Sequence, residues 1–155
     1  MKIERYEKAF LAVGAVTLVV FLVALAYTSV AMGIHLPGRA GEVDPAAVRE
    51  MPPFDDPGVR DLGGGRYEVV LLSQAWGFVP NEVRVPAGSE VTFIATSVDV
   101  LHGIHVDGTR VNMMLIPGQV SRNTYVFENP GEHLLVCHEY CGIGHHTMSG
   151  RVVVE

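Results

Sequence analysis

One segment of this chain is too long and too apolar to belong to an ordinary soluble domain. Residues 9–34, "AFLAVGAVTLVVFLVALAYTSVAMGI", run for 26 positions without a charged side chain. A helix rises about 1.5 Å per residue, so about 20 apolar residues are enough to cross the hydrocarbon core of a bilayer. The segment therefore predicts a single transmembrane helix. A cleaved signal peptide is the alternative, although its apolar stretch is usually only about 7 to 15 residues long.

Basic side chains precede this segment. Lys2, Arg5 and Lys8 lie within residues 1–8, and the next basic residue is Arg39. Because basic residues favour the cytoplasmic side of a membrane, we expect a cytoplasmic N-terminus and a single pass through the cell membrane. The rest of the chain is then a domain on the outer side, periplasmic or extracellular.

The part of the chain after residue 34 is acidic. It carries 15 Asp and Glu against eight Arg and no Lys, a formal net charge of −7. This sign disfavours nucleic acid as a partner. An acidic surface serves solubility, or it attracts a basic protein over a long range.

Two further regions follow the apolar segment. Residues 35–60 hold five of the nine prolines and show little hydrophobic periodicity, which predicts a semi-rigid linker. Residues 61–155 consist of short β-branched runs separated by turn signals. The runs are "RYEVVLL", "EVRV", "EVTFIAT", "TRVNMMLI", "SRNTYVFE", "EHLLVC" and "GRVVVE". About seven strands without a convincing amphipathic helix predict an all-β domain, a small Greek-key β-sandwich.

Soft metal ligands are concentrated in residues 136–148, "VCHEYCGIGHHTM". These thirteen positions hold both cysteines, three of the seven histidines and a methionine. The segment falls between a predicted strand and the final strand "GRVVV", so it lies on a loop, where sites are commonly built. Thiolate and thioether select soft ions such as Cu(I), and a His and Cys set with a weak Met ligand is typical of an electron-transfer copper site. The candidate ligands in this loop are Cys137, Cys141, His145 and Met148.

A mononuclear copper site of this kind uses one cysteine, whereas this loop has two. Two thiolates at this spacing can bridge a pair of copper ions. A further ligand is expected from an earlier strand, and "SVDVLHGIHVDG" offers His102 and His105. Residues three apart in a strand point to opposite faces, so only one of the two can face the metal, and the spacing alone does not choose between them.

Two alternatives remain for the loop on residue types alone. In an oxidising compartment Cys137 and Cys141 can form a disulfide, and two cysteines with two histidines can hold zinc. A disulfide leaves the histidine and methionine spacing unexplained, and zinc has no use for a thioether.

Together, "DVLHGIH" and "CHEYCGIGHHTM" resemble the CuA domain of cytochrome c oxidase subunit 2. The motif of that family is a strand histidine followed by C-x-E-x-C-x-x-x-H-x-x-M, and the resemblance extends from the apolar segment to Glu155. The single helix and the short chain are most similar to the subunit 2 of B-type heme-copper oxidases. The resemblance implies a cupredoxin fold for residues 61–155.

The resemblance also implies a binuclear copper centre, CuA, with six ligands. Both cysteines bridge the two ions, and each ion takes one histidine and one weak ligand. The implied ligands are the bridging Cys137 and Cys141, His102 and Met148 on one ion, and His145 and the backbone carbonyl of Glu139 on the other. Three histidines are then not ligands: His105, His138 and His146.

Electron transfer into an oxidase is the function that this resemblance implies. Cytochrome c, or a similar electron donor, reduces the copper pair, and the electron passes to heme in the catalytic subunit 1, where oxygen becomes water. The chain itself has no C-x-x-C-H heme attachment motif. Trp76 is a candidate for receiving the electron, with an ordinary core or surface tryptophan as the alternative. In the mitochondrial type, a Glu at the position of Glu139 also binds magnesium at the subunit border; a salt bridge or hydrogen bond across that border is the alternative.

Three rival functions share the copper motif. Nitrous oxide reductases carry it in a much larger soluble enzyme. A nitric oxide reductase with a CuA subunit differs from an oxidase only in its partner subunit. A membrane-anchored copper carrier would exchange its metal readily.

Overall fold

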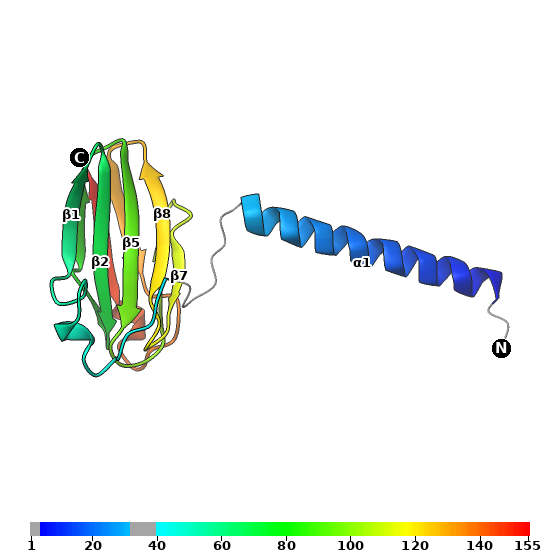
Figure 1. Cartoon of the computed structure of the whole chain (residues 1–155), viewed down its shortest axis with the longest axis horizontal. Helices are drawn as coiled ribbons and strands as arrows, with labels where there is room; N and C mark the ends of the chain where they lie inside the picture. Colours follow the sequence, from blue (N-terminus) through cyan, green and yellow to red (C-terminus); the bar gives the residue numbers. More distant parts are fainter. Residues whose placement is uncertain (1–3, 32–39) are drawn as a thin grey trace. The chain divides into compact units, whose positions relative to one another are not determined.

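The computed structural model describes residues 4–31 and 40–155, which form two compact units (Figure 1). The first unit is the helix α1 (Arg5–Ala31), and it is apolar on all sides with no buried residue. Its 27 residues give a length of about 40 Å. Within the described part of the chain, it is the one helix long and apolar enough to cross a membrane. It starts before the predicted residue 9, and residues 32–34 of the prediction lie outside the described residues.

The second unit is a sandwich of two five-stranded sheets (Figure 1). The first sheet has the order β1 (Gly58–Gly63), β2 (Arg66–Gln74), β5 (Ser89–Ser97) and β8 (Ser121–Phe127), and β3 (Gly77–Val79) pairs with β2. The second sheet has the order β4 (Glu82–Val85), β10 (Ser149–Val154), β9 (Gly131–Val136), β6 (His102–Val106) and β7 (Asn112–Leu115). This arrangement confirms the predicted all-β, cupredoxin-like sandwich.

Alternation of apolar and polar residues sets the faces of the strands. In β5, Val91, Phe93 and Ala95 are buried between the sheets. Phe93 meets Phe127 of β8 edge to face, with ring centroids 6.3 Å apart. Two neighbouring pairs are parallel, β2 with β5 and β4 with β10, and the other pairs are antiparallel. The main core therefore lies between the two sheets, where side chains from both interlock.

The predicted linker differs from the structure over its described part. In residues 35–60, Val48 and Phe54 are fully buried, and they pack with Val70 and Leu72 of β2 into a second apolar cluster. The segment also contains the short 3₁₀-helix η1 (Val48–Glu50) and the start of β1. This stretch is part of the folded domain because two large apolar side chains are enough to hold it on the outer face of the first sheet.

Candidate metal centre

A closed loop between β9 and β10 carries most of the predicted ligands. Its ends are joined where the Cys137 N–H donates to the Met148 carbonyl at 3.2 Å. Inside the loop, the His145 N–H donates to the Gly142 carbonyl at 3.1 Å, and the 3₁₀-helix η2 (His145–Thr147) follows. The hydrogen bonds make the loop a compact turn, so its side chains are held against the end of the sandwich.

The two cysteines form the centre of this arrangement. Their Sγ atoms are 3.9 Å apart, both thiols are free, and each residue is 8% exposed. A disulfide requires about 2.05 Å, so the structure does not contain one. Burial, followed by the neighbouring Cys137, raises the pKa of the Cys141 thiol to about 11. Metal binding must therefore displace a proton from Cys141.

The other predicted ligand atoms surround the sulfur pair. His102 Nδ1 lies 3.8 Å from Cys137 Sγ, and the Glu139 carbonyl oxygen lies 3.3 Å from the same sulfur. His145 Nδ1 and Met148 Sδ each lie 3.6 Å from Cys141 Sγ. His102 and Met148 are buried, and His145 is half-buried. The structure thus brings together the side chains or carbonyls of all six predicted residues.

The structure distinguishes between the two histidines of β6. His102 is fully buried, and its ligand atom lies within 4.8 Å of those of both cysteines. His105 is on the opposite face of the strand, where its Nδ1–H donates to the Val111 carbonyl at 3.2 Å. The period of two along a strand separates them, as the sequence spacing requires.

Asp99 fixes the ring of His102, a role that sequence reasoning missed. His102 Nε2 lies 2.8 Å from Asp99 Oδ1, so the Nε2–H donates to the carboxylate and the lone pair is left on Nδ1, which faces Cys137. Asp99 Oδ2 also accepts the Ala75 N–H at 2.6 Å. Burial alone would raise the pKa of Asp99, but hydrogen bonds from Ala75, His102 and Val100 hold it below its usual value. The sequence offered one indication of this role, since Asp99 lies three residues before the candidate ligand His102.

Trp76 packs against the loop that carries the candidate ligands. It is 50% exposed and occupies the turn between β2 and β3. A Cβ atom built at Gly144 would be 2.5 Å from Trp76 Cγ, and one at Gly142 would be 3.1 Å from its Nε1. The indole therefore packs directly on the glycine backbone between Cys141 and His145.

The remaining histidines near the loop are outside the ligand cluster. The His138 ring packs on Gly103 of β6 and fills the space that a Cβ atom there would occupy. Its Nδ1 is 3.7 Å from Glu139 Oε1. His146 is exposed. His138 and His146 thus lie beside the cluster without entering it.

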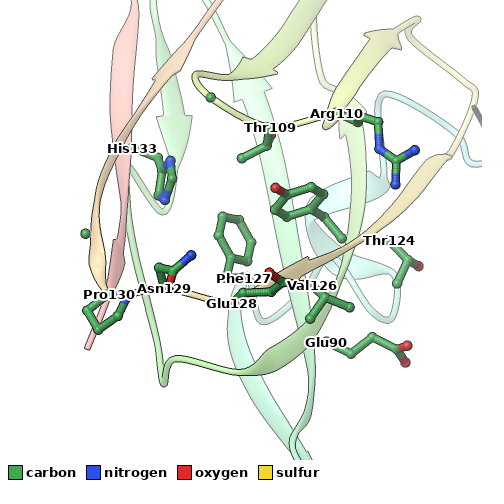
Figure 2. Close-up of a pocket in the computed structure, with 13 residues that line it drawn as sticks. Glu90, Thr109, Arg110, Thr124, Val126, Phe127, Glu128, Asn129, Pro130 and His133 are labelled. Atoms are coloured by element: carbon green, nitrogen blue, oxygen red, sulfur yellow. The ribbon is translucent and has the colours of Figure 1, made fainter.

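A separate open cleft of about 830 Å³ is formed by the end of β8, the turn between β6 and β7, and the start of β9. Figure 2 shows Phe127 in its centre, with His133 and Arg110 on opposite sides. His133 Nδ1–H donates to the Asp107 carbonyl at 2.9 Å, and its ring meets Phe127 edge to face. None of the six candidate ligands lines this cleft. The metal-ligand cluster is therefore a small buried site and not part of this cleft.

Residues 72–155 match the family described as "Cytochrome C oxidase subunit II, periplasmic domain". The chain belongs to this family. The cytochrome c oxidase subunit 2 of Thermus thermophilus is 42% identical over 157 residues, which cover 99% of this chain and 94% of the relative. A chain in the cryo-EM structure of a heme-copper terminal oxidase dimer matches 97% of this chain, at a TM-score of 0.79 and 36% identity, and is itself covered completely.

Membership of this family gives the general role of the molecule. It is a membrane-anchored, copper-binding subunit 2 of an oxidoreductase complex, the subunit through which electrons enter a heme-copper oxidase. The nitrous-oxide reductase of Stutzerimonas stutzeri is also similar, with 36% identity over 105 residues. That match covers 65% of this chain but only 16% of the reductase. The likeness to that enzyme is therefore confined to a small part of it and does not support nitrous oxide reduction by this chain.

Proposed function

We propose that this domain holds a binuclear copper centre that takes electrons from cytochrome c, or a similar electron donor, and passes them to heme in catalytic subunit 1. There, oxygen is reduced to water. The observation that carries the proposal is the cluster of two free buried thiols with imidazole, thioether and carbonyl groups within 3.9 Å of a sulfur.

The ligand set fits two copper ions that share both sulfurs. One ion would be held by His102, next to Cys137, and Met148, next to Cys141. The other would be held by His145, next to Cys141, and the Glu139 carbonyl, next to Cys137. Each proposed pair thus has one member beside each sulfur, as expected if both thiolates bridge. Copper held by these residues would supply one-electron chemistry, with the change of charge spread over the metal pair and the two sulfurs.

The protein's own groups hold this site rigid and dry. Asp99 orients the His102 ring, the hydrogen bond between the Cys137 N–H and the Met148 carbonyl closes the loop, and burial of the thiols excludes water. Rigid ligands move little when one electron arrives, which favours fast transfer at a small driving force. Zinc is a poorer fit, because the buried Met148 thioether next to Cys141 is a ligand for soft ions.

The surface around the cluster suits a protein electron donor. Exposed apolar side chains lie on the three connections that meet at the site; they are Trp76, Val100, Leu101, Tyr140 and Ile143. The chain after residue 34 is acidic, which steers a basic donor toward it. We propose that Trp76, half exposed and in contact with the ligand loop, receives the electron. We further propose that residues 1–8 are cytoplasmic and that the copper domain lies on the outer side of the membrane.

The identity of the electron acceptor is tested on the purified membrane complex. We expect its heme groups to be reduced after the copper site when reduced cytochrome c is added, and oxygen to be consumed in proportion. Consumption of nitric oxide in preference to oxygen would instead establish the CuA-type nitric oxide reductase. Loss of copper to a mild chelator during turnover would favour a copper carrier.

The side-chain carboxylate of Glu139 can have a second role, because the proposed copper ligand at this residue is its backbone carbonyl, which does not depend on the side chain. The side chain is 38% exposed, and the nearest ionisable partner in the described part of the chain is His138 at 3.7 Å. We propose that it supplies one ligand to a magnesium ion at the border with subunit 1, because hard cations favour carboxylate oxygen. A direct ion pair or hydrogen bond across that border is the alternative.

Manganese replaces magnesium in such a site and is visible by electron paramagnetic resonance. We expect the complex from cells grown with manganese to show a bound signal that is lost in Glu139→Gln, with the copper spectrum unchanged. If the wild-type complex shows no bound manganese, the magnesium site is rejected and the ion pair or hydrogen bond across the border remains.

A further inference from the structure

The turn that carries Trp76 is held at two places. Its main chain has an unusual conformation, with φ of 152° at Trp76 and a hydrogen bond from the Trp76 N–H to the Gln74 carbonyl at 2.8 Å. A non-glycine residue keeps such a φ only when its surroundings fix it. One fixed point is the Ala75 N–H, which donates to the Asp99 carboxylate. The second is the contact of the indole with the ligand loop.

Gly144 is the residue that makes this second contact possible. A Cβ atom there would lie 2.5 Å from Cγ, 2.6 Å from Cδ2 and 3.0 Å from Cβ of Trp76. These distances are far below van der Waals contact, so any side chain at this position displaces the indole. The φ of Gly144 is −84°, which every L-residue can adopt. Space, and not backbone conformation, therefore requires glycine at position 144.

The contact also has a defined place relative to the ligands. Gly142 and Gly144 lie between Cys141 and His145 in the chain, and the indole covers both glycines. Electron tunnelling weakens steeply with each gap between atoms, so direct packing on the segment that joins two copper ligands provides a short route. The turn that carries Trp76 is also connected to His102 by hydrogen bonds, because Asp99 accepts from both the Ala75 N–H and the His102 ring.

We propose that Gly144 is a positioning residue that keeps the Trp76 indole on the Cys141–His145 segment, and that electrons reach the copper ligands through this segment. The step transfers one electron from a reduced cytochrome-type donor, which is oxidised, to the oxidised copper pair, and no proton or group moves with it. This inference rests on the proposed function, in which Trp76 receives the electron.

The positioning step is tested without copper, by tryptophan fluorescence of the full chain in detergent. Trp76 is the only tryptophan, so all of the tryptophan emission comes from it when the excitation wavelength avoids the five tyrosines. We expect Gly144→Ala to make the indole more accessible to a neutral quencher. Gly131→Ala is the control, because a Cβ atom at Gly131 meets nothing within 4 Å, and its quenching should match the wild type. Equal quenching in Gly144→Ala and wild type would overturn the inference.

The electron-transfer step is tested by the rate at which reduced cytochrome c reduces the copper site of the membrane complex. We expect Gly144→Ala and Trp76→Ala each to slow this rate severalfold, with an unchanged copper spectrum. The double variant should be no slower than Trp76→Ala, since Gly144 acts through the indole. Additive slowing in the double variant, or a normal rate in Gly144→Ala alone, overturns the inference. A normal rate in Trp76→Ala instead overturns the proposed role of Trp76 itself.

Discussion

Replacing Cys141 by serine is expected to abolish the copper pair while leaving the sandwich folded. Serine keeps the size of the side chain, but its hydroxyl is a hard ligand that does not ionise near neutral pH, so it cannot bridge soft copper ions. Cys141 lies in the loop between β9 and β10, outside every strand. The loss should therefore be confined to the metal site and to electron transfer.

Electron paramagnetic resonance of the copper-loaded full chain measures this effect. The wild-type spectrum should show one unpaired electron shared by two copper nuclei, and Cys141→Ser should lose that sharing and the ability to accept electrons from cytochrome c. His146→Ala is the matched control, because His146 is exposed on the same loop outside the ligand cluster. A single-copper spectrum from the wild-type chain, or a shared electron in Cys141→Ser, contradicts the binuclear site.

Much of the fold follows from local sequence patterns. The uncharged run of residues 9–34 predicted the apolar helix, and alternating β-branched runs predicted most strands with nearly correct bounds. The strand β6 was not among the seven runs, and was expected only as the strand that supplies a histidine ligand. The strands β1 and β3 were not predicted, because "GVRDLG" is rich in glycine and charge and β3 has only three residues. These two strands form because each pairs with β2 through backbone hydrogen bonds. Their formation therefore depends on tertiary contacts and not on local sequence.

The described part of residues 35–60 shows a related limit. Its prolines predicted a semi-rigid linker, but proline content does not say whether a segment is free or packed on a folded domain. The burial of Val48 and Phe54 depends on the outer face of β2, which supplies Val70 and Leu72. A pattern confined to one segment carries no information about such a distant surface.

The sequence likewise predicted some residues of the candidate site and missed others. Five of the six predicted ligands are close in sequence, and their motif places them on one loop, so chain proximity alone brings them together. His102 needed a resemblance to choose it over His105, and the structure supplies the physical reason in the face of β6 on which it lies. Asp99 lies three residues before His102, but its second partner, Ala75, comes from the separate β2–β3 connection. Gly144 emerged only from the fold, because Trp76 packs on it from that same separate connection.

Removing the carboxylate of Asp99 is expected to weaken copper binding by about 10- to 100-fold, the usual effect of losing a group that orients a metal-bound histidine. Asp99 accepts the His102 Nε2–H, and that hydrogen bond keeps the lone pair on Nδ1 toward Cys137. In Asp99→Ala the ring can rotate or change tautomer, and the Ala75 N–H loses its acceptor. The two hydrogen bonds through which Asp99 joins the Trp76 turn to His102 are then both lost.

Competition with a copper chelator, followed by loss of the copper spectrum, measures the affinity of Asp99→Ala in the full chain. Asp107→Ala is the matched control, since Asp107 is an exposed aspartate immediately after the other end of β6 and should leave the affinity unchanged. Asp99→Asn separates hydrogen bonding from charge: its carbonyl oxygen still accepts from His102, but its amide cannot accept from Ala75, so an intermediate affinity is expected. Wild-type affinity in Asp99→Ala would show that packing of the fully buried His102 ring fixes its orientation without the carboxylate.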